Sequence, residues 1–118
     1  MPAGRYHIII HANGVNNDSL TDKEGLTNFL NILPGKINMS ILNPPVVVEG
    51  IPANPGLSGF VIIDFSHISI HTFTEYNQVM VDIFSCKPYD QEDATQAVLD
   101  YFQVPREQAM VEKVYWGE

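Results

Sequence analysis

The sequence has a single cysteine and few basic residues. Its 118 residues include 6 Lys and Arg against 14 Asp and Glu, a formal net charge of −8 at pH 7. Proteins that bind nucleic acid need clustered positive charge to neutralise phosphates. The bases here are scattered singly, so we expect no nucleic-acid partner. The one cysteine, Cys86, excludes an internal disulfide and a multi-cysteine metal site. By composition it is either a buried apolar residue or a reactive thiol.

Long hydrophobic runs are also absent. The longest, such as Val46–Val48 and Phe60–Ile63, are far too short to span a membrane. We therefore expect no targeting segment, no membrane association and a cytoplasmic protein. Apolar residues make up 45% of the chain and charged residues 17%, which is typical of a globular protein, and the length predicts a single domain over residues 1–118.

Short apolar or alternating runs bounded by glycine, proline and asparagine predict strands. These runs are Tyr6–His11, Val46–Glu49, Leu57–Asp64, His67–Phe73, Gln78–Ser85 and Ala109–Trp116. We expect Asn16–Ser19 to be a turn and Gly50–Gly56, which is rich in proline and glycine, to be a loop. Lys36–Pro45 is ambiguous.

Two segments have the spacing of amphipathic helices. A capping box at Thr21–Glu24 begins the first, which is expected to end before Pro34-Gly35. The second begins at Asp90 or Gln91 and stops near Pro105. The order is strand and helix, then four strands, then helix and strand. This order predicts an α+β fold, a two-layer sandwich with a mostly antiparallel sheet and helices packed on one face.

The stretch GLSGFVIIDFSHISIHTFTEYNQVMVDIFSC, from Gly56 to Cys86, concentrates the reactive side chains. Alternation puts four residues on one face of a strand: His67, Ser69, His71 and Phe73. On the neighbouring strand, Asp82, Phe84 and Cys86 also share a face, so Cys86 could approach the Ser66 end.

This string resembles the bacterial and archaeal S-adenosylmethionine decarboxylases. In that family a strand ends in Glu-Ser-His, a Leu-(Ser/Thr)-Ile-His-Thr-(Trp/Phe)-Pro-Glu-Tyr segment follows, and a later strand ends in Cys. Members are proenzymes that cut themselves before the serine, which becomes a pyruvoyl group. That ketone forms a Schiff base with the substrate amine and acts as an electron sink for loss of carbon dioxide.

The resemblance implies roles in self-processing and catalysis. Phe65–Ser66 would be the scissile bond and Ser66 the precursor of the pyruvoyl cofactor. His71 and Ser58 match residues that assist self-processing through proton transfer and polarisation of the ester intermediate. Cys86 matches the thiol that returns a proton to the substrate carbon after decarboxylation.

The resemblance also implies a substrate and a partner. Glu75 matches an acid that hydrogen-bonds the substrate ribose, and Phe73 an aromatic residue that stacks on adenine. The small-molecule substrate would be S-adenosylmethionine, and its product would donate an aminopropyl group in spermidine biosynthesis. Small-chain members are homodimers with sites near the subunit interface, so we expect a homodimer.

The sequence departs from the family pattern in three places. Phe65 stands where the family has Glu, the Ile51–Pro55 segment lacks an aromatic residue that stacks on adenine, and His11 aligns with a Glu of the first strand. Two alternatives therefore stay open. One is an uncleaved relative that serves as a binding or regulatory protein, and the other is a pyruvoyl-dependent decarboxylase for a different amino acid.

Several of these residues also have a structural interpretation. Ser66 could be an ordinary serine at the end of a strand, and Glu75–Asn77 a solvated turn. Phe73 could belong to the core. We interpret His67 as structural. His7 and His11 predict no metal site, because residues four apart on a strand are separated by about 13 Å.

Overall fold

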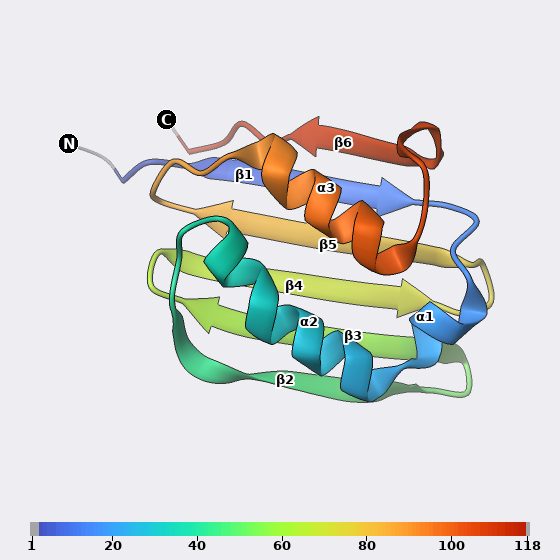
Figure 1. Ribbon diagram of the computed structural model, residues 1–118. Helices are drawn as coiled ribbons and strands as arrows, with labels where there is room; N and C mark the ends of the chain where they lie inside the picture. The colour runs from blue at the N-terminus through green and yellow to red at the C-terminus, as the bar shows by residue number, and fades with distance from the viewer. Residues whose placement is uncertain (1–2, 118) are drawn as a thin grey trace.

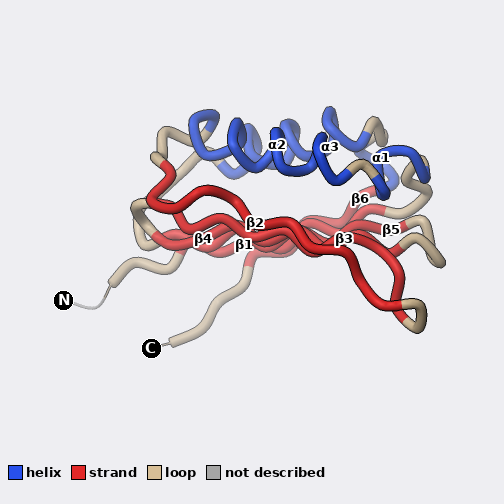
Figure 2. The backbone as a smooth tube through the Cα atoms, turned by 90° about the horizontal axis from the view of Figure 1, so that it is seen from below, coloured by secondary structure: helices blue, strands red, loops and turns tan. Residues whose placement is uncertain are grey.

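The computed structural model describes residues 3–117, which form one antiparallel sheet with helices over a single face (Figure 1, Figure 2). The six strands lie in the order β2-β3-β4-β5-β1-β6. They are β1 (Tyr6–Ala12), β2 (Ile41–Ile51), β3 (Asn54–Ile63), β4 (Ser66–Phe73), β5 (Gln78–Ser85) and β6 (Ala109–Lys113). The helices are α1 (Asn17–Thr21), α2 (Lys23–Lys36), α3 (Gln91–Phe102) and the 3₁₀ turn η1 (Arg106–Gln108). The predicted α+β two-layer sandwich is confirmed. Within residues 3–117, the helices are too short or too polar to cross a membrane.

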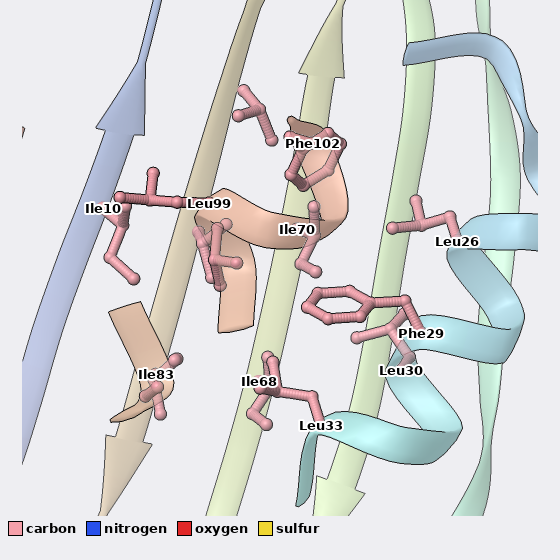
Figure 3. Close-up of a cluster of buried hydrophobic side chains, with 14 of the residues drawn as sticks. Ile10, Leu26, Phe29, Leu30, Leu33, Ile68, Ile70, Ile83, Leu99 and Phe102 are labelled. Atoms are coloured by element: carbon pink, nitrogen blue, oxygen red, sulfur yellow. The ribbon is translucent and has the colours of Figure 1, made fainter. Parts of the chain in front are cut away.

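The hydrophobic core lies between the sheet and helices α2 and α3 (Figure 3). Apolar residues repeat at helical spacing in α2 and α3 and at every second position in the strands. In β4, Ile68 and Ile70 are fully buried under the helices, whereas His67, Ser69 and His71 alternate onto the face that no helix covers. The predicted alternation is therefore confirmed, and we call the uncovered side of the sheet the open face.

The predicted start of the first long helix is wrong by one residue. Asp22 caps α2, and its carboxylate accepts a backbone N–H of the first turn at 2.9 Å. Thr21 instead ends the short helix α1, where its hydroxyl donates to the Asn17 carbonyl at 3.0 Å. The expected turn at Asn16–Ser19 is therefore largely helical. Aspartate caps helices at least as well as threonine, so the local sequence is compatible with an N-cap at either Thr21 or Asp22.

Helix α2 continues past its predicted stop at Pro34-Gly35 and ends at Lys36. A proline removes one backbone donor and crowds the preceding turn. Pro34 is nevertheless buried together with Leu33 in the core, so burial of the last turn outweighs the missing hydrogen bond. The chain leaves the helix at Asn38, which has a positive φ of 59°.

Strand β2 is the largest departure from the sequence prediction. It includes Pro44 and Pro45, and the supposed loop Gly50–Gly56 is mostly paired hairpin. β2 is an edge strand, so one side of its backbone has no strand beside it and proline is tolerated there. The register with β3 shifts across the two prolines. Sequence patterns alone do not reveal which strand lies at an edge.

Candidate active site

The Phe65–Ser66 bond lies at the tip of the β3–β4 hairpin. Asp64 and Phe65 form the turn, and Ser66 is paired with Ile63. Ser66 has a φ of 149°, in a region that residues with a Cβ rarely adopt. Tight hairpins usually place positive φ on the central turn residues, where glycine or asparagine accommodates it. Here φ is positive at neither Asp64 nor Phe65, and the strain falls on Ser66.

Hydrogen bonds on two sides hold this strained turn. The Asp64 N–H donates to the Ser40 carbonyl at 2.9 Å, and the Asp64 carboxylate accepts the Ser40 N–H at 3.1 Å. Just after the end of β5, the Cys86 N–H donates to the Phe65 carbonyl oxygen at 2.9 Å. A strained residue persists only where its surroundings over-determine its conformation, and these contacts supply that constraint.

Cys86 lies beside the same turn and is exposed. The expectation that it approaches the Ser66 end is confirmed, because Ser66 is paired with Ser85. The segment after Cys86 is anchored by Tyr89, whose hydroxyl donates to the Ile83 carbonyl at 2.9 Å. Burial raises the pKa of the Tyr89 phenol above its usual range, so this donor keeps its proton at physiological pH.

Ser58 and His71 meet on the open face. They are directly opposite each other on β3 and β4, with Ser58 Oγ 2.9 Å from His71 Nδ1. A hydroxyl paired with an imidazole can relay a proton. Along β4, however, His71 is separated from Ser66 by ~17 Å, at about 3.4 Å per residue. Within one chain, this pair therefore cannot reach the Phe65–Ser66 bond.

Phe73 and Glu75 lie further from Ser66, at the other end of β4, where Glu75 is exposed in the turn before β5. Gly56 permits the close approach of β3 at this end, because a Cβ at its φ of 145° would collide with the Thr72 carbonyl oxygen. The residues singled out from the sequence thus form two groups. The turn group is Phe65, Ser66 and Cys86, and the far group is Ser58, His71, Phe73 and Glu75.

The family model for S-adenosylmethionine decarboxylase matches residues 6–113, nearly the whole chain. The chain belongs to the S-adenosylmethionine decarboxylase family. It is similar to the S-adenosylmethionine decarboxylase proenzyme of Thermodesulfovibrio yellowstonii, with 34% identity over 82% of this chain and 70% of the relative. It is also similar to the arginine decarboxylase proenzyme of Caldivirga maquilingensis, with 31% identity over 74% of this chain and 68% of that relative.

A solved structure agrees with the fold. The crystal structure of the adenosylmethionine decarboxylase of Aquifex aeolicus superposes on this chain with a TM-score of 0.77. The match covers 100% of this chain and 96% of the Aquifex aeolicus chain. Sequence identity with that protein is 23%, so the likeness concerns the fold alone. The curated relatives are decarboxylase proenzymes by name, which supports a decarboxylase-like enzyme.

Unlike the family pattern, this member of the S-adenosylmethionine decarboxylase family has an aromatic ring before the serine, and a cation faces it. Lys87 Nζ lies 4.7 Å from the Phe65 ring centroid and donates to the Asn38 carbonyl at 2.9 Å. Sequence reasoning missed Lys87, because its contact with the β3–β4 turn depends on how β4 pairs with β5.

A second group missed by sequence reasoning occupies the open face. Asp82 Oδ1 lies 2.9 Å from His7 Nε2 and 3.7 Å from His67 Nε2. Trp116 Nε1–H donates to His7 Nδ1 at 3.0 Å. That nitrogen is therefore unprotonated, and Nε2 carries the hydrogen that is donated to Asp82. Trp116 lies beyond the end of β6 at Lys113, so the strand predicted to reach Trp116 is shorter than expected.

His11, which the family resemblance aligns with a glutamate of the first strand, lies in β1. It lies between Met80 and Met110 on the open face, and its Nε2 is buried without a hydrogen-bond partner among the described residues. A cavity of about 190 Å³ adjoins it. In residues 3–117, no three His, Cys, Asp or Glu side chains are grouped so as to hold a metal ion.

Proposed function

We propose that this chain is the proenzyme of a pyruvoyl-dependent amino-acid decarboxylase and that it cleaves itself between Phe65 and Ser66. The positive φ of Ser66 carries the proposal, because strain at a clamped serine favours a reaction that breaks the strained linkage. The Ser66 hydroxyl is the nucleophile that attacks the Phe65 carbonyl carbon. The Cys86 N–H already bonded to that carbonyl oxygen would stabilise the negative charge that develops on it.

A pyruvoyl group at residue 66 would supply a ketone that draws electrons from the carbon losing carbon dioxide. The residues present fit such a group, since Ser66 is the required precursor and the exposed Cys86 is hydrogen-bonded through its backbone N–H to Phe65, the residue before Ser66. In this proposal Cys86 returns a proton to the substrate carbon after carbon dioxide is lost. The replacement of the family glutamate by Phe65 leaves the backbone carbonyl, which is the group attacked, in place.

We propose further that the enzyme is a homodimer whose sites are completed across the interface. Ser58 and His71 lie too far from Ser66 of their own chain to assist it. The open face carries large exposed apolar side chains: Ile9, Val46, Val48, Phe60, Ile62, Met80 and Met110. These apolar side chains lie on both sides of the polar residues of β4, and so much exposed apolar surface on one face marks an interaction site. Two open faces packed about a two-fold axis, with the β4 strands antiparallel, would bring His71 of one chain to Ser66 of its partner.

We propose S-adenosylmethionine as the substrate, with Glu75 on its ribose and Phe73 on its adenine, and a product used in spermidine biosynthesis. A second candidate is a different amino acid, such as arginine. It is favoured by the cavity of about 420 Å³ beside Ile51–Pro55, whose described lining is aliphatic and polar without an aromatic ring for adenine. The name of the Caldivirga maquilingensis relative points the same way.

Denaturing mass spectrometry of freshly purified protein tests the cleavage. We expect one fragment ending at Phe65 and one beginning with a pyruvoyl group at residue 66. Ser66→Ala should stay intact, whereas Ser69→Ala, a change on the same strand, should be cut normally. A wild-type chain that stays intact on prolonged incubation would favour the uncleaved binding or regulatory relative.

Mixing two variants tests the shared site. Ser66→Ala cannot be cut but retains His71, and His71→Ala retains Ser66 but should be cut slowly. When the two are co-expressed, mixed dimers should restore cleavage of the His71→Ala chain. If cleavage of that chain is as slow in the mixture as alone, the two groups do not meet across a dimer interface.

Release of labelled carbon dioxide separates the substrates. The mature protein is incubated with carboxyl-labelled S-adenosylmethionine or arginine at equal concentration. Faster release from S-adenosylmethionine supports the leading proposal, and Glu75→Gln should then weaken substrate binding. Release from arginine alone supports the second candidate.

A further inference from the structure

We propose that Lys87 stabilises the leaving group in self-cleavage: its ammonium binds the carboxylate set free at Phe65 and thereby promotes the elimination step. The inference rests on the proposed cleavage at Phe65–Ser66. Lys87 lies just outside the string from Gly56 to Cys86 on which the family resemblance was based, so that resemblance gives it no role.

Lys87 is fixed at both ends beside the β3–β4 turn of Asp64 and Phe65, which we call the processing turn. Its backbone is clamped by Ser85, whose hydroxyl donates to the Lys87 carbonyl at 2.8 Å and accepts the Lys87 N–H at 2.9 Å. Its ammonium donates to the Asn38 carbonyl at 2.9 Å and lies 4.7 Å from the Phe65 ring centroid. The residue before it, Cys86, holds the Phe65 carbonyl oxygen. Phe65 is therefore contacted by both the backbone of this segment and its cation.

The chemistry of the cut identifies the step that needs a cation. In the first step the Ser66 hydroxyl attacks the Phe65 carbonyl, a C–O ester bond replaces the C–N amide bond, and the hydroxyl proton passes to the released amine. In the second, a base removes the Ser66 Cα proton, the Cβ–O bond breaks, and the electron pair leaves with the Phe65 carboxylate. The resulting enamine tautomerises to an imine, and one water converts it to the ketone as ammonia leaves. Only the elimination creates a lasting negative charge at Phe65.

The local charges make that carboxylate unfavourable unless a cation is present. Its neighbour in the chain is Asp64, whose carboxylate is already held in the turn by the Ser40 N–H. Two carboxylates on adjacent residues repel each other. Among residues 3–117 of the uncut chain, the Lys87 ammonium has no anionic partner and lies against the Phe65 ring, a contact that is modest at an exposed site. An ammonium has three donors, so it can donate to the new carboxylate while it keeps its hydrogen bond to the Asn38 carbonyl.

The test compares Lys87→Met with wild type in denaturing mass spectra over time, with and without hydroxylamine. Hydroxylamine cuts an ester at Phe65, whereas the amide of the uncut chain resists it. We expect cleavage of Lys87→Met to be slower by about tenfold or more, which corresponds to the loss of one charge-assisted contact. We also expect chains of unchanged mass to accumulate that hydroxylamine cuts at Phe65. Lys87→Arg should restore the rate.

Lys23→Met is the matched control, because Lys23 is an exposed lysine on α2 and its loss should leave the rate unchanged. Lys87→Gln keeps a long polar side chain without charge and replaces Lys87→Met if that variant fails to fold. The proposal is overturned if Lys87→Met and Lys87→Gln are cut at the wild-type rate. It is also overturned if both variants are cut slowly but accumulate no hydroxylamine-sensitive chains. Lys87 would then act in the formation of the ester and not in its elimination. A wild-type chain that remains intact would instead overturn the proposed self-cleavage itself, and this inference with it.

Discussion

The two faces of the sheet are built from alternate residues of the same strands, yet they differ in kind. On β4, Ile68 and Ile70 face the helices and are fully buried, whereas the intervening Ser69 and His71 line the open face. One set of alternate residues thus specifies the fold, and the other presents the chemistry. Such a division lets the open face acquire new residues without loss of the core.

The largest expected effect is a difference in stability between substitutions on the two faces of the sheet. Leu30, on α2, is fully buried, and Leu30→Ala should lower the free energy of unfolding by roughly 2–5 kcal/mol. Ile62, on the open face, is 44% exposed, and Ile62→Ala should change it by about 0.5 kcal/mol or less in dilute protein. Urea denaturation measures both. Equal losses would show that the open face is as well packed as the helix-covered one.

A smaller effect is expected at the processing turn. Ser66→Gly and Ser66→Ala both lack the hydroxyl, so both chains stay intact and can be compared directly. Glycine adopts the φ of 149° without a clashing Cβ, so Ser66→Gly should be more stable than Ser66→Ala by about 1 kcal/mol. Thermal unfolding of the two variants measures the difference. Equal stabilities would argue against strain as the driving force for cleavage.

The hydrogen bond from Trp116 to His7 should contribute about 1 kcal/mol. Trp116→Phe keeps a ring but loses the indole donor, so the His7 nitrogen loses its partner and stability should fall by that amount. Tyr115→Phe is the control, because Tyr115 is 85% exposed. Cleavage should proceed at the wild-type rate in both variants. Slower cleavage in Trp116→Phe alone would connect this group to the processing turn.

The smallest effect is a pH dependence in the helix layer. Burial, together with the Asp22 carboxylate, raises the pKa of Tyr101 from 10.0 to about 12. A raised pKa contributes stability that is complete below pH 10.0 and is lost as the pH rises through about 12. Denaturant unfolding across this window should show a fall that is reduced in Tyr101→Phe. Tyr76→Phe, on an exposed turn, should match wild type. Identical curves for all three proteins would contradict the burial of this phenol.

The fold class and most elements could be predicted because periodicity is local. The predicted secondary structure was wrong where contacts between residues distant in the sequence determine the local conformation. Pro44 and Pro45 fit β2 only because that strand lies at an edge, and Pro34 stays helical because the core buries it. Of the candidate site, the sequence string pointed to Ser66 through the family resemblance, but the contact of Lys87 with Phe65 depends on strand pairing that no local pattern contains.

The sheet order has a consequence for a chain cut after Phe65. The first fragment would hold β1, β2 and β3, and the second β4, β5 and β6, yet β1 lies between β5 and β6. The strands of the two polypeptides would be interleaved in one sheet. Hydrogen bonds of the β3–β4, β1–β5 and β1–β6 pairs would join the polypeptides. Separating them would require three ladders to open together. The two fragments of the mature protein would therefore stay associated as one folded unit. They would separate only after complete unfolding.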